Sequence, residues 1–130
     1  MLSVDKVNSY YGEFRVLYDV SLKVNDGELV VAFGPNGHGK STILKTICGL
    51  HPPASGTIIF DGKDITRLPV IKLVEMGIIY IAEDRHLFPQ MTVLENLKLG
   101  AYNASARAKA EASLDYVLTM FPRLKERLDK

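Results

Sequence analysis

The alternation of apolar and polar residues in the first third of the chain predicts β-strands. Every second residue of 20–24 (VSLKV) is apolar, and Asp26 and Gly27 then provide a turn. The segment 28–34 (ELVVAFG) is instead almost continuously apolar, which is typical of a strand buried on both faces of a sheet. The segment 78–82 (IIYIA) has the same character. We therefore expect two buried strands in addition to the alternating ones.

Helical spacing of apolar residues begins after the first of these buried segments. Apolar residues recur with a helical period over 43–50, and the Gly- and Pro-rich sequence 49–56 (GLHPPASG) ends that helix. The segment 56–66 (GTIIFDGKDIT) reads as a strand that enters a turn at its Asp-Gly pair, and 69–77 (PVIKLVEMG) reads as a short helix. The pattern is therefore mixed α and β.

The last third of the chain is predicted to be helical. Thr92 followed by Glu95 forms a capping box, in which each side chain satisfies a backbone donor at the start of a helix. From Ser105 onward, apolar residues recur at helical spacing until Pro122 interrupts the pattern. No fixed-period repeat is present in the sequence.

Composition places the chain among ordinary globular proteins. It has 130 residues, of which 47% are hydrophobic and 24% are charged, so it is at most one domain. The formal net charge of +1 gives no overall field that would attract nucleic acid, and we expect no nucleic-acid partner. The apolar runs are too short to span a bilayer, so any link to a membrane is expected to go through a partner protein. Cys48 is the single cysteine, which excludes an internal disulfide.

The candidate chemistry lies between the first buried segment and the first helix. There the sequence GPNGHGKST matches the phosphate-binding pattern G-x-x-x-x-G-K-[ST] in full. Glycines let successive backbone N–H groups curl around phosphate oxygens, Lys40 adds a positive charge, and the Ser41 hydroxyl suits Mg²⁺. A glycine-rich turn with an incidental Lys-Ser is disfavoured, because a strand precedes it and a helix follows. The predicted nucleotide-binding residues of the loop are Gly34, Pro35, Asn36, Gly37, His38, Gly39, Lys40, Ser41 and Thr42.

The sequence around this loop resembles the ATP-binding subunits of ABC transporters. GELVVAFG precedes the loop, and SGTIIFDGKDIT follows the first helix. Within that superfamily, IAEDRHLFPQMTVLENL (81–97) resembles the branched-chain amino-acid importers, specifically the shorter of their two ATPase subunits, with related urea or amide importers as an alternative. The resemblance covers residues 2–128. It implies an α/β fold of the P-loop NTPase type, with an N-terminal antiparallel β subdomain and the start of a helical subdomain.

This resemblance implies one incomplete nucleotide-binding domain over residues 1–130. We expect residues 1–27 to begin the β subdomain, 28–83 to form the P-loop core and a β segment, and 84–130 to begin the helical subdomain. The family's Leu-Ser-Gly-Gly-Gln signature, the strand with its Mg²⁺ aspartate and catalytic glutamate, and the switch histidine do not occur before Lys130. No general base for water is identified, so we expect the chain alone to be inactive. We also expect it to be the N-terminal part of a longer ATPase and marginally stable or aggregation-prone by itself.

Three further site residues follow from the resemblance. Tyr11 is expected to stack on adenine, with Val16 packing nearby; the alternative is that Tyr11 belongs to the core and that Tyr10 or neither residue meets the base. Glu83 occupies the position where most ABC ATPases place a glutamine near the Mg²⁺ shell. We expect Ser41 and Glu83 to hold Mg²⁺ together with ATP, although a solvated loop acid is the alternative for Glu83.

The histidines are not expected to form a metal site. His38 either places an imidazole near the phosphates or points outward and contributes only its backbone N–H. His51 and His86 have no partners at ligand spacing.

The segment that follows Glu83 resembles the surface on which a permease docks. In this segment, Asp84 to Met91, the residues Leu87, Phe88 and Pro89 would form an apolar contact patch; packing under the next helix is the alternative.

The function implied by the resemblance is that of an ATP-binding subunit of an importer. Mg-ATP would close a dimer with a second ATPase subunit, either a second copy or the longer sibling, and hydrolysis would drive the uptake of branched-chain amino acids. The partners would be membrane permease subunits and, indirectly, a periplasmic or surface solute-binding protein. The chain would be cytoplasmic and peripheral on the inner face of the cell membrane. The alternative is a nucleotide-binding module or remnant without turnover, whereas a guanine-specific switch is disfavoured because its Asn-Lys-x-Asp motif is absent.

Overall fold

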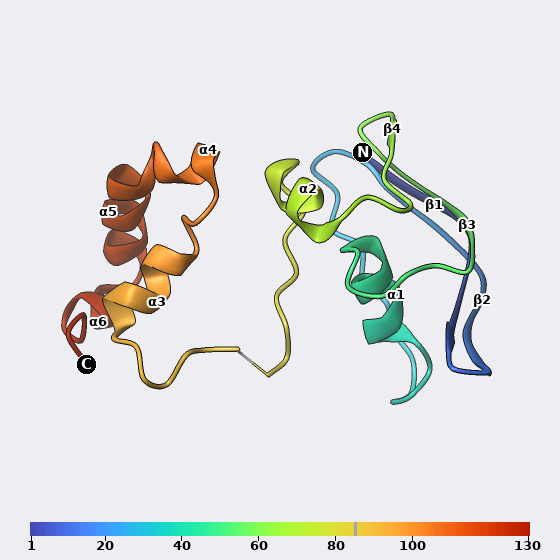
Figure 1. Ribbon diagram of the computed structural model, residues 1–130, viewed down its shortest axis with the longest axis horizontal. Helices are drawn as coiled ribbons and strands as arrows, with labels where there is room; N and C mark the ends of the chain where they lie inside the picture. Colours follow the sequence, from blue (N-terminus) through green and yellow to red (C-terminus); the bar gives the residue numbers. More distant parts are fainter. Residues whose placement is uncertain (85) are drawn as a thin grey trace. The chain divides into compact units, whose positions relative to one another are not determined.

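The computed structural model describes residues 1–84 and 86–130, which form two compact units, Met1–Tyr80 and Ile81–Lys130. The first unit combines an antiparallel sheet with two helices, and the second is helical (Figure 1). This mixture of elements agrees with the expected α/β composition.

The sheet of the first unit has the strand order β2-β1-β3-β4, and its neighbouring strands are antiparallel. The strands are β1 (Leu2–Tyr11), β2 (Phe14–Val24), β3 (Ser55–Phe60) and β4 (Lys63–Asp64). β1 and β2 form a hairpin that pairs Leu2 with Val24 at one end and Tyr11 with Phe14 at the other, with register shifts between. The two-residue connection includes Gly12 at φ 60°, a left-handed conformation that suits glycine.

A polar cluster surrounds Asn8, where the register of this hairpin shifts. The Asn8 side chain is only 8% exposed. Its amide nitrogen lies 3.0 Å from the Asp19 carboxylate and 2.8 Å from the Ser55 hydroxyl, and its amide oxygen accepts from the Asp19 backbone N–H and from Arg15. Because three strands contribute to these bonds, the cluster ties β1 to both of its neighbours. The hydrogen bond from Asn8, followed by the Arg15 charge, lowers the pKa of Asp19.

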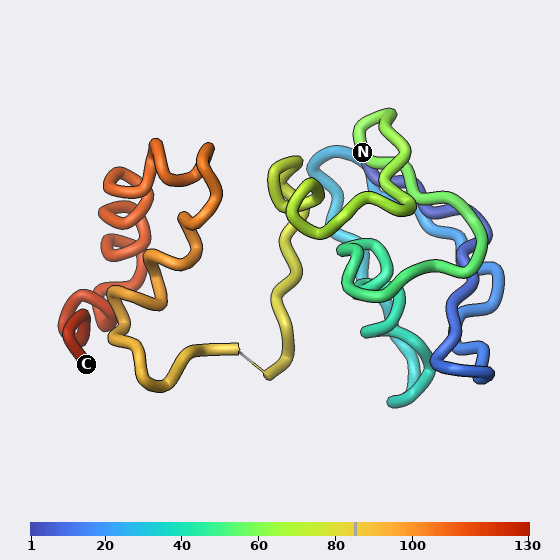
Figure 2. Tube along the Cα trace, in the orientation of Figure 1, coloured from blue at the N-terminus to red at the C-terminus, as the bar shows by residue number. Residues whose placement is uncertain are grey.

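Two helices complete the first unit, α1 (Lys40–Ile47) and α2 (Val70–Glu75). Both agree with the predicted periodicity, and α1 turns its buried residues Ile43 and Ile47 toward the core. The eight buried apolar residues of that core come from the sheet, both helices and the segment after β4: Val4, Val7, Leu17, Ile43, Ile47, Ile58, Ile65 and Leu73. The path from β2 through the loop into α1 can be followed in Figure 2.

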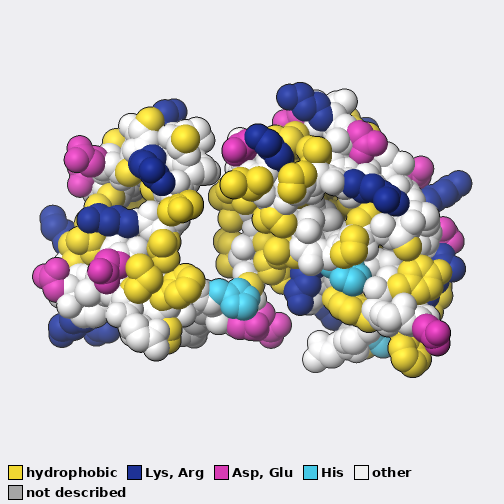
Figure 3. All heavy atoms as spheres, viewed as in Figure 1, with side chains coloured by type: hydrophobic (Ala, Val, Ile, Leu, Met, Phe, Trp, Pro, Cys, Tyr) yellow, Lys and Arg dark blue, Asp and Glu magenta, His cyan; other side chains and the backbone are white. Residues whose placement is uncertain are grey.

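The prediction of buried strands at 28–34 and 78–82 is wrong in this structure. Neither segment is assigned to a strand, and neither pairs with another strand among the described residues. Leu29 is 89% exposed, Phe33 92% and Ile81 91%. The apolar sequence makes both segments suitable for a buried strand, but a strand forms only where a neighbour completes its hydrogen bonds. Hydrophobic side chains are accordingly visible on the surface (Figure 3).

The second unit contains α3 (Val93–Leu99), α4 (Ala104–Arg107), α5 (Ala110–Met120) and α6 (Pro122–Lys125). The predicted capping box at the start of α3 is confirmed, since the Thr92 and Glu95 side chains each accept from the other's backbone N–H. Pro122 ends the longest helical stretch as predicted and begins α6.

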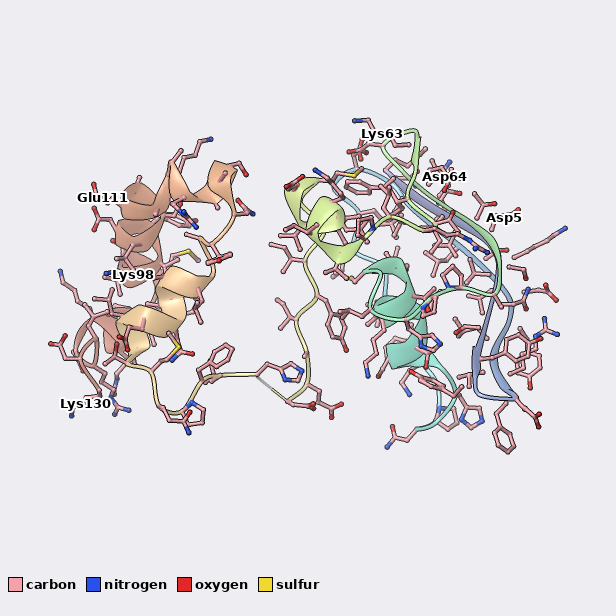
Figure 4. All side chains as sticks on the ribbon, viewed as in Figure 1. Asp5, Lys63, Asp64, Lys98, Glu111 and Lys130 are labelled. Carbon is pink, nitrogen blue, oxygen red and sulfur yellow. The ribbon has the colours of Figure 1, made fainter. Side chains whose placement is uncertain are left out.

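A groove of about 630 Å³ runs along the helices of the second unit. Its lining includes Leu97 from α3 and Leu114 and Val117 from α5. Lys98 and Glu111, which Figure 4 labels on α3 and α5, also line it. The groove is therefore mainly apolar with charged residues among its walls.

The capping box makes the start of α3 sensitive to acid. The Thr92 backbone N–H, followed by its hydroxyl, holds the pKa of Glu95 below its ordinary value of 4.5. The folded pKa is the lower one, so the contribution of the box is fully present above pH 4.5 and is lost as the pH falls through the folded pKa. We predict that the protection of the Thr92 amide against hydrogen exchange, measured by NMR and corrected for the intrinsic exchange rate, falls over this range.

Glu95→Gln is the matched control, because its amide oxygen can still accept from Thr92 but does not titrate. Its intrinsic-rate-corrected exchange should not change over the same range. Protection of Thr92 that falls equally in both proteins would contradict the assignment to Glu95.

Candidate nucleotide-binding site

The glycine loop enters α1 through left-handed backbone. Gly37 and Gly39 both have φ 82°, a conformation that costs a residue with a Cβ atom about 1–2 kcal/mol. Gly39 is the N-cap of α1 and provides no side-chain cap, so the first backbone N–H groups of the helix have no side-chain acceptor at this cap. Donors at the start of a helix suit an anion. This part of the chain therefore fits a phosphate group.

Gly39 also fixes the loop against the hairpin. A Cβ atom at Gly39 would lie 3.0 Å from Leu17 Cδ2 and 3.2 Å from the Val16 carbonyl oxygen, both in β2. At Gly37 a Cβ atom would meet nothing within 4 Å. The same Cβ atom would lie 3.7 Å from Val16 Cγ1, so Val16, predicted to pack near the base, lies beside the end of the phosphate loop.

Lys40 places its ammonium group on the loop itself. Its Nζ donates to the carbonyl oxygens of Gly34 and Pro35, each at 2.8 Å. These carbonyls are neutral acceptors, so the positive charge of Lys40 is not cancelled by them. The ammonium group therefore lies at this loop, and its contact with phosphates stays a prediction.

The other predicted loop residues differ in exposure. The Ser41 side chain is exposed, whereas Thr42 is buried in the first turn of α1. His38 is exposed, and its Nδ1 lies 3.1 Å from the Asn36 carbonyl oxygen, so the imidazole is held beside the loop. The Ser41 hydroxyl is therefore accessible to a ligand.

Tyr11 lies at the end of β1 and is 47% exposed, so it is not a buried core residue. Its ring stacks on the imidazole of His51, with 4.3 Å between ring centroids and 30° between the planes. The sequence pattern gives no signal for this contact, because His51 lies 40 positions further along the chain. A role for Tyr11 in base stacking stays a prediction.

The predicted Mg²⁺ ligands Ser41 and Glu83 belong to different units. Glu83 is exposed in a turn at the start of the second unit, so its pairing with Ser41 stays a prediction. No group of three or more His, Cys, Asp or Glu residues that could hold a metal ion occurs within residues 1–84 and 86–130.

The predicted docking segment 84–91 includes Arg85, which lies outside the described residues. Leu87 and Phe88 are 65% and 55% exposed. The backbone N–H and carbonyl of Phe88 both bond to the Asn96 side chain on α3, which fixes the backbone and leaves the ring exposed. Packing entirely under the next helix therefore does not describe these two side chains in this structure.

Comparison with known proteins identifies the family of this chain. Residues 17–128 match the family model described as ABC transporter. This chain belongs to the ABC transporter family. Its described residues contain no helix long and apolar enough to cross a bilayer.

The chain is similar to curated ATP-binding proteins of this family. It is 42% identical over 130 residues to the high-affinity branched-chain amino acid transport ATP-binding protein BraG of Pseudomonas aeruginosa. That match covers 100% of this chain and 55% of BraG, so the chain spans about half the length of this relative. The predicted resemblance to the branched-chain amino-acid group is confirmed.

Solved structures confirm the predicted fold. MJ1267, an ATP-binding cassette of an ABC transporter, matches with a TM-score of 0.81 and 29% identity over 100% of this chain and 56% of that chain. A dimeric structure of the cassette MJ0796 bound to ADP and Pi matches with a TM-score of 0.66 and 28% identity over 88% of this chain and 56% of that chain. The fold is therefore that of the N-terminal part of an ABC ATPase cassette.

Gly37 and Gly39 allow the close approach of the loop to β2 to be tested. We predict that Gly39→Ala lowers the free energy of unfolding more than Gly37→Ala does. Both variants place alanine at φ 82°, but only Gly39→Ala also pushes against Leu17 and the Val16 carbonyl. Urea unfolding followed by circular dichroism measures the difference. Equal losses would show that the loop does not press on β2.

Proposed function

We propose that this chain binds Mg-ATP and that the loop 34–42 receives the phosphates. The observation that carries the proposal is the left-handed backbone at Gly37 and Gly39, which leads into α1 beside the Lys40 ammonium. Backbone N–H groups and a cation converge there, which suits the charge on a triphosphate. The match to the ABC transporter family supports the same ligand.

The remaining predicted residues would contact other parts of the nucleotide. Tyr11 is half exposed at the tip of the hairpin and would stack on adenine, with Val16 beside it. The accessible Ser41 hydroxyl would bind Mg²⁺, and a carboxylate oxygen of Glu83 would bind Mg²⁺ or one of its waters. Bound Mg²⁺ would neutralise part of the phosphate charge.

For the whole protein, we propose an ATP-binding subunit that energises the import of branched-chain amino acids through ATP hydrolysis. The 42% identity to BraG along all 130 residues supports this substrate class. Its partners would be membrane permease subunits, a second ATPase subunit and, indirectly, a solute-binding protein. The subunit would lie in the cytoplasm on the inner face of the membrane. The dimeric form of MJ0796 supports pairing with a second ATPase subunit.

A nucleotide-binding module without turnover is the second candidate. It rests on the loop alone, where the Lys40 ammonium lies beside the backbone that leads into α1. Lys40, Ser41 and the loop glycines can bind phosphate without a general base for water, because binding needs only donors and charge.

We predict that Lys40→Ala weakens Mg-ATP binding about 10-fold or more, because a charged hydrogen-bond donor to the phosphates is lost. Isothermal titration calorimetry of the 130-residue chain measures the affinity. Lys45→Ala is the matched control, because Lys45 lies in the last turn of the same helix, away from its N-terminus. Equal affinities for the unaltered chain and Lys40→Ala would refute phosphate binding by this loop.

Phosphate release tests whether the 130-residue chain alone turns over the nucleotide. If the chain is a binding module, its release of phosphate from Mg-ATP equals that of Lys40→Ala although the unaltered chain binds the nucleotide. Turnover that depends on Lys40 would contradict the expectation that the chain alone is inactive.

A further inference from the structure

The loop that carries His51 is fixed at both of its ends. The backbone N–H groups of Leu50 and His51 donate to the Lys45 carbonyl of α1, at 2.9 and 3.3 Å. On the other side, the Ala54 N–H donates to the Asn8 carbonyl of β1 at 2.8 Å. These bonds place His51 between the end of α1 and the strand that leads to Tyr11.

The imidazole of His51 is placed by packing against Tyr11. Its Nε2 is buried and has no hydrogen-bond partner among the described residues. A buried polar atom in this state requires an explanation, because leaving it unpaired costs free energy. A hydrogen bond from Nε2 therefore does not hold the ring, and the contact that the structure describes for it is the stack on Tyr11, with 4.3 Å between centroids.

Tyr11 needs such a support. It lies beside the Gly12 turn, at the last pair of the β1–β2 hairpin, and its side chain is 47% exposed. An exposed aromatic side chain at a hairpin end can adopt several rotamers, and a ligand that stacks on it must restrict them. The imidazole covers one face of the phenol ring and restricts the ring before any ligand arrives.

We propose that His51 is a positioning residue for base recognition. It holds the Tyr11 ring so that the ring's opposite face accepts the flat base of the nucleotide. This inference rests on the proposed binding of Mg-ATP by the loop 34–42. His51 acts through Tyr11 and contributes nothing to the phosphates, so its effect depends on the presence of both the base and the Tyr11 ring.

The experiment compares two probes on the full 130-residue chain. Mg-ATP reports the base and the phosphates, whereas Mg-tripolyphosphate reports the phosphate loop alone. We expect His51→Ala to weaken Mg-ATP binding about three- to ten-fold, because a ring-to-ring contact that preorganises Tyr11 is lost. The affinity for Mg-tripolyphosphate should be unchanged, which also shows that the variant still forms the loop.

Two further variants separate positioning from a general structural role. His51→Phe keeps a flat ring in the stack and should restore the affinity for Mg-ATP to within about two-fold of the unaltered chain. In a Tyr11→Ala background, the change of His51 to Ala should have no further effect, because the ring on which it acts is gone.

Each contrary result has a definite meaning. Equal Mg-ATP affinities of the unaltered chain and His51→Ala would overturn the inference and leave the proposed function standing. A His51→Ala defect that is the same for Mg-tripolyphosphate, or that persists without Tyr11, would also overturn it. If the unaltered chain binds neither probe, the proposed function fails and the inference fails with it.

Discussion

The close approach of Gly39 to β2 is the constraint on which the candidate site depends. The loop enters α1 through left-handed backbone at this point, and a Cβ atom there would lie 3.0 Å from Leu17, a residue of the core. The same Cβ atom would lie 3.2 Å from the Val16 carbonyl oxygen. One glycine therefore joins the phosphate loop, the first helix and the hairpin, so that the position of the loop is set by the core of the first unit.

Within that unit, the Asn8 cluster ties the hairpin that carries Tyr11 to β3 and to the segment that carries His51. Asn8 bonds to Asp19 and Ser55 through its side chain, and its carbonyl accepts from Ala54 beside the His51 loop. Groups for phosphate and base thus belong to one compact unit, Met1–Tyr80. Glu83, the proposed carboxylate partner of Mg²⁺, belongs to the second unit, Ile81–Lys130.

Sequence patterns predict those elements whose hydrogen bonds join residues that are close together in the chain. The loop, α1 and the Thr92–Glu95 capping box follow from short patterns whose hydrogen bonds form between near neighbours. The segments 28–34 and 78–82 were predicted as buried strands, but apolar character shows only what a segment can bury, while strand formation needs a neighbour. The Tyr11–His51 stack joins residues 40 positions apart, and nothing in either local pattern indicates that contact.

We propose that the loop 34–42 receives the phosphates through its backbone N–H groups. The most direct test is the change of backbone amide ¹⁵N and ¹H shifts on addition of Mg-ATP to the chain. We expect the largest changes at Gly37, Gly39 and Lys40, with smaller ones at Tyr11, which would stack on the base. Amide shifts that stay constant across the loop while Mg-ATP binds elsewhere would contradict this proposal.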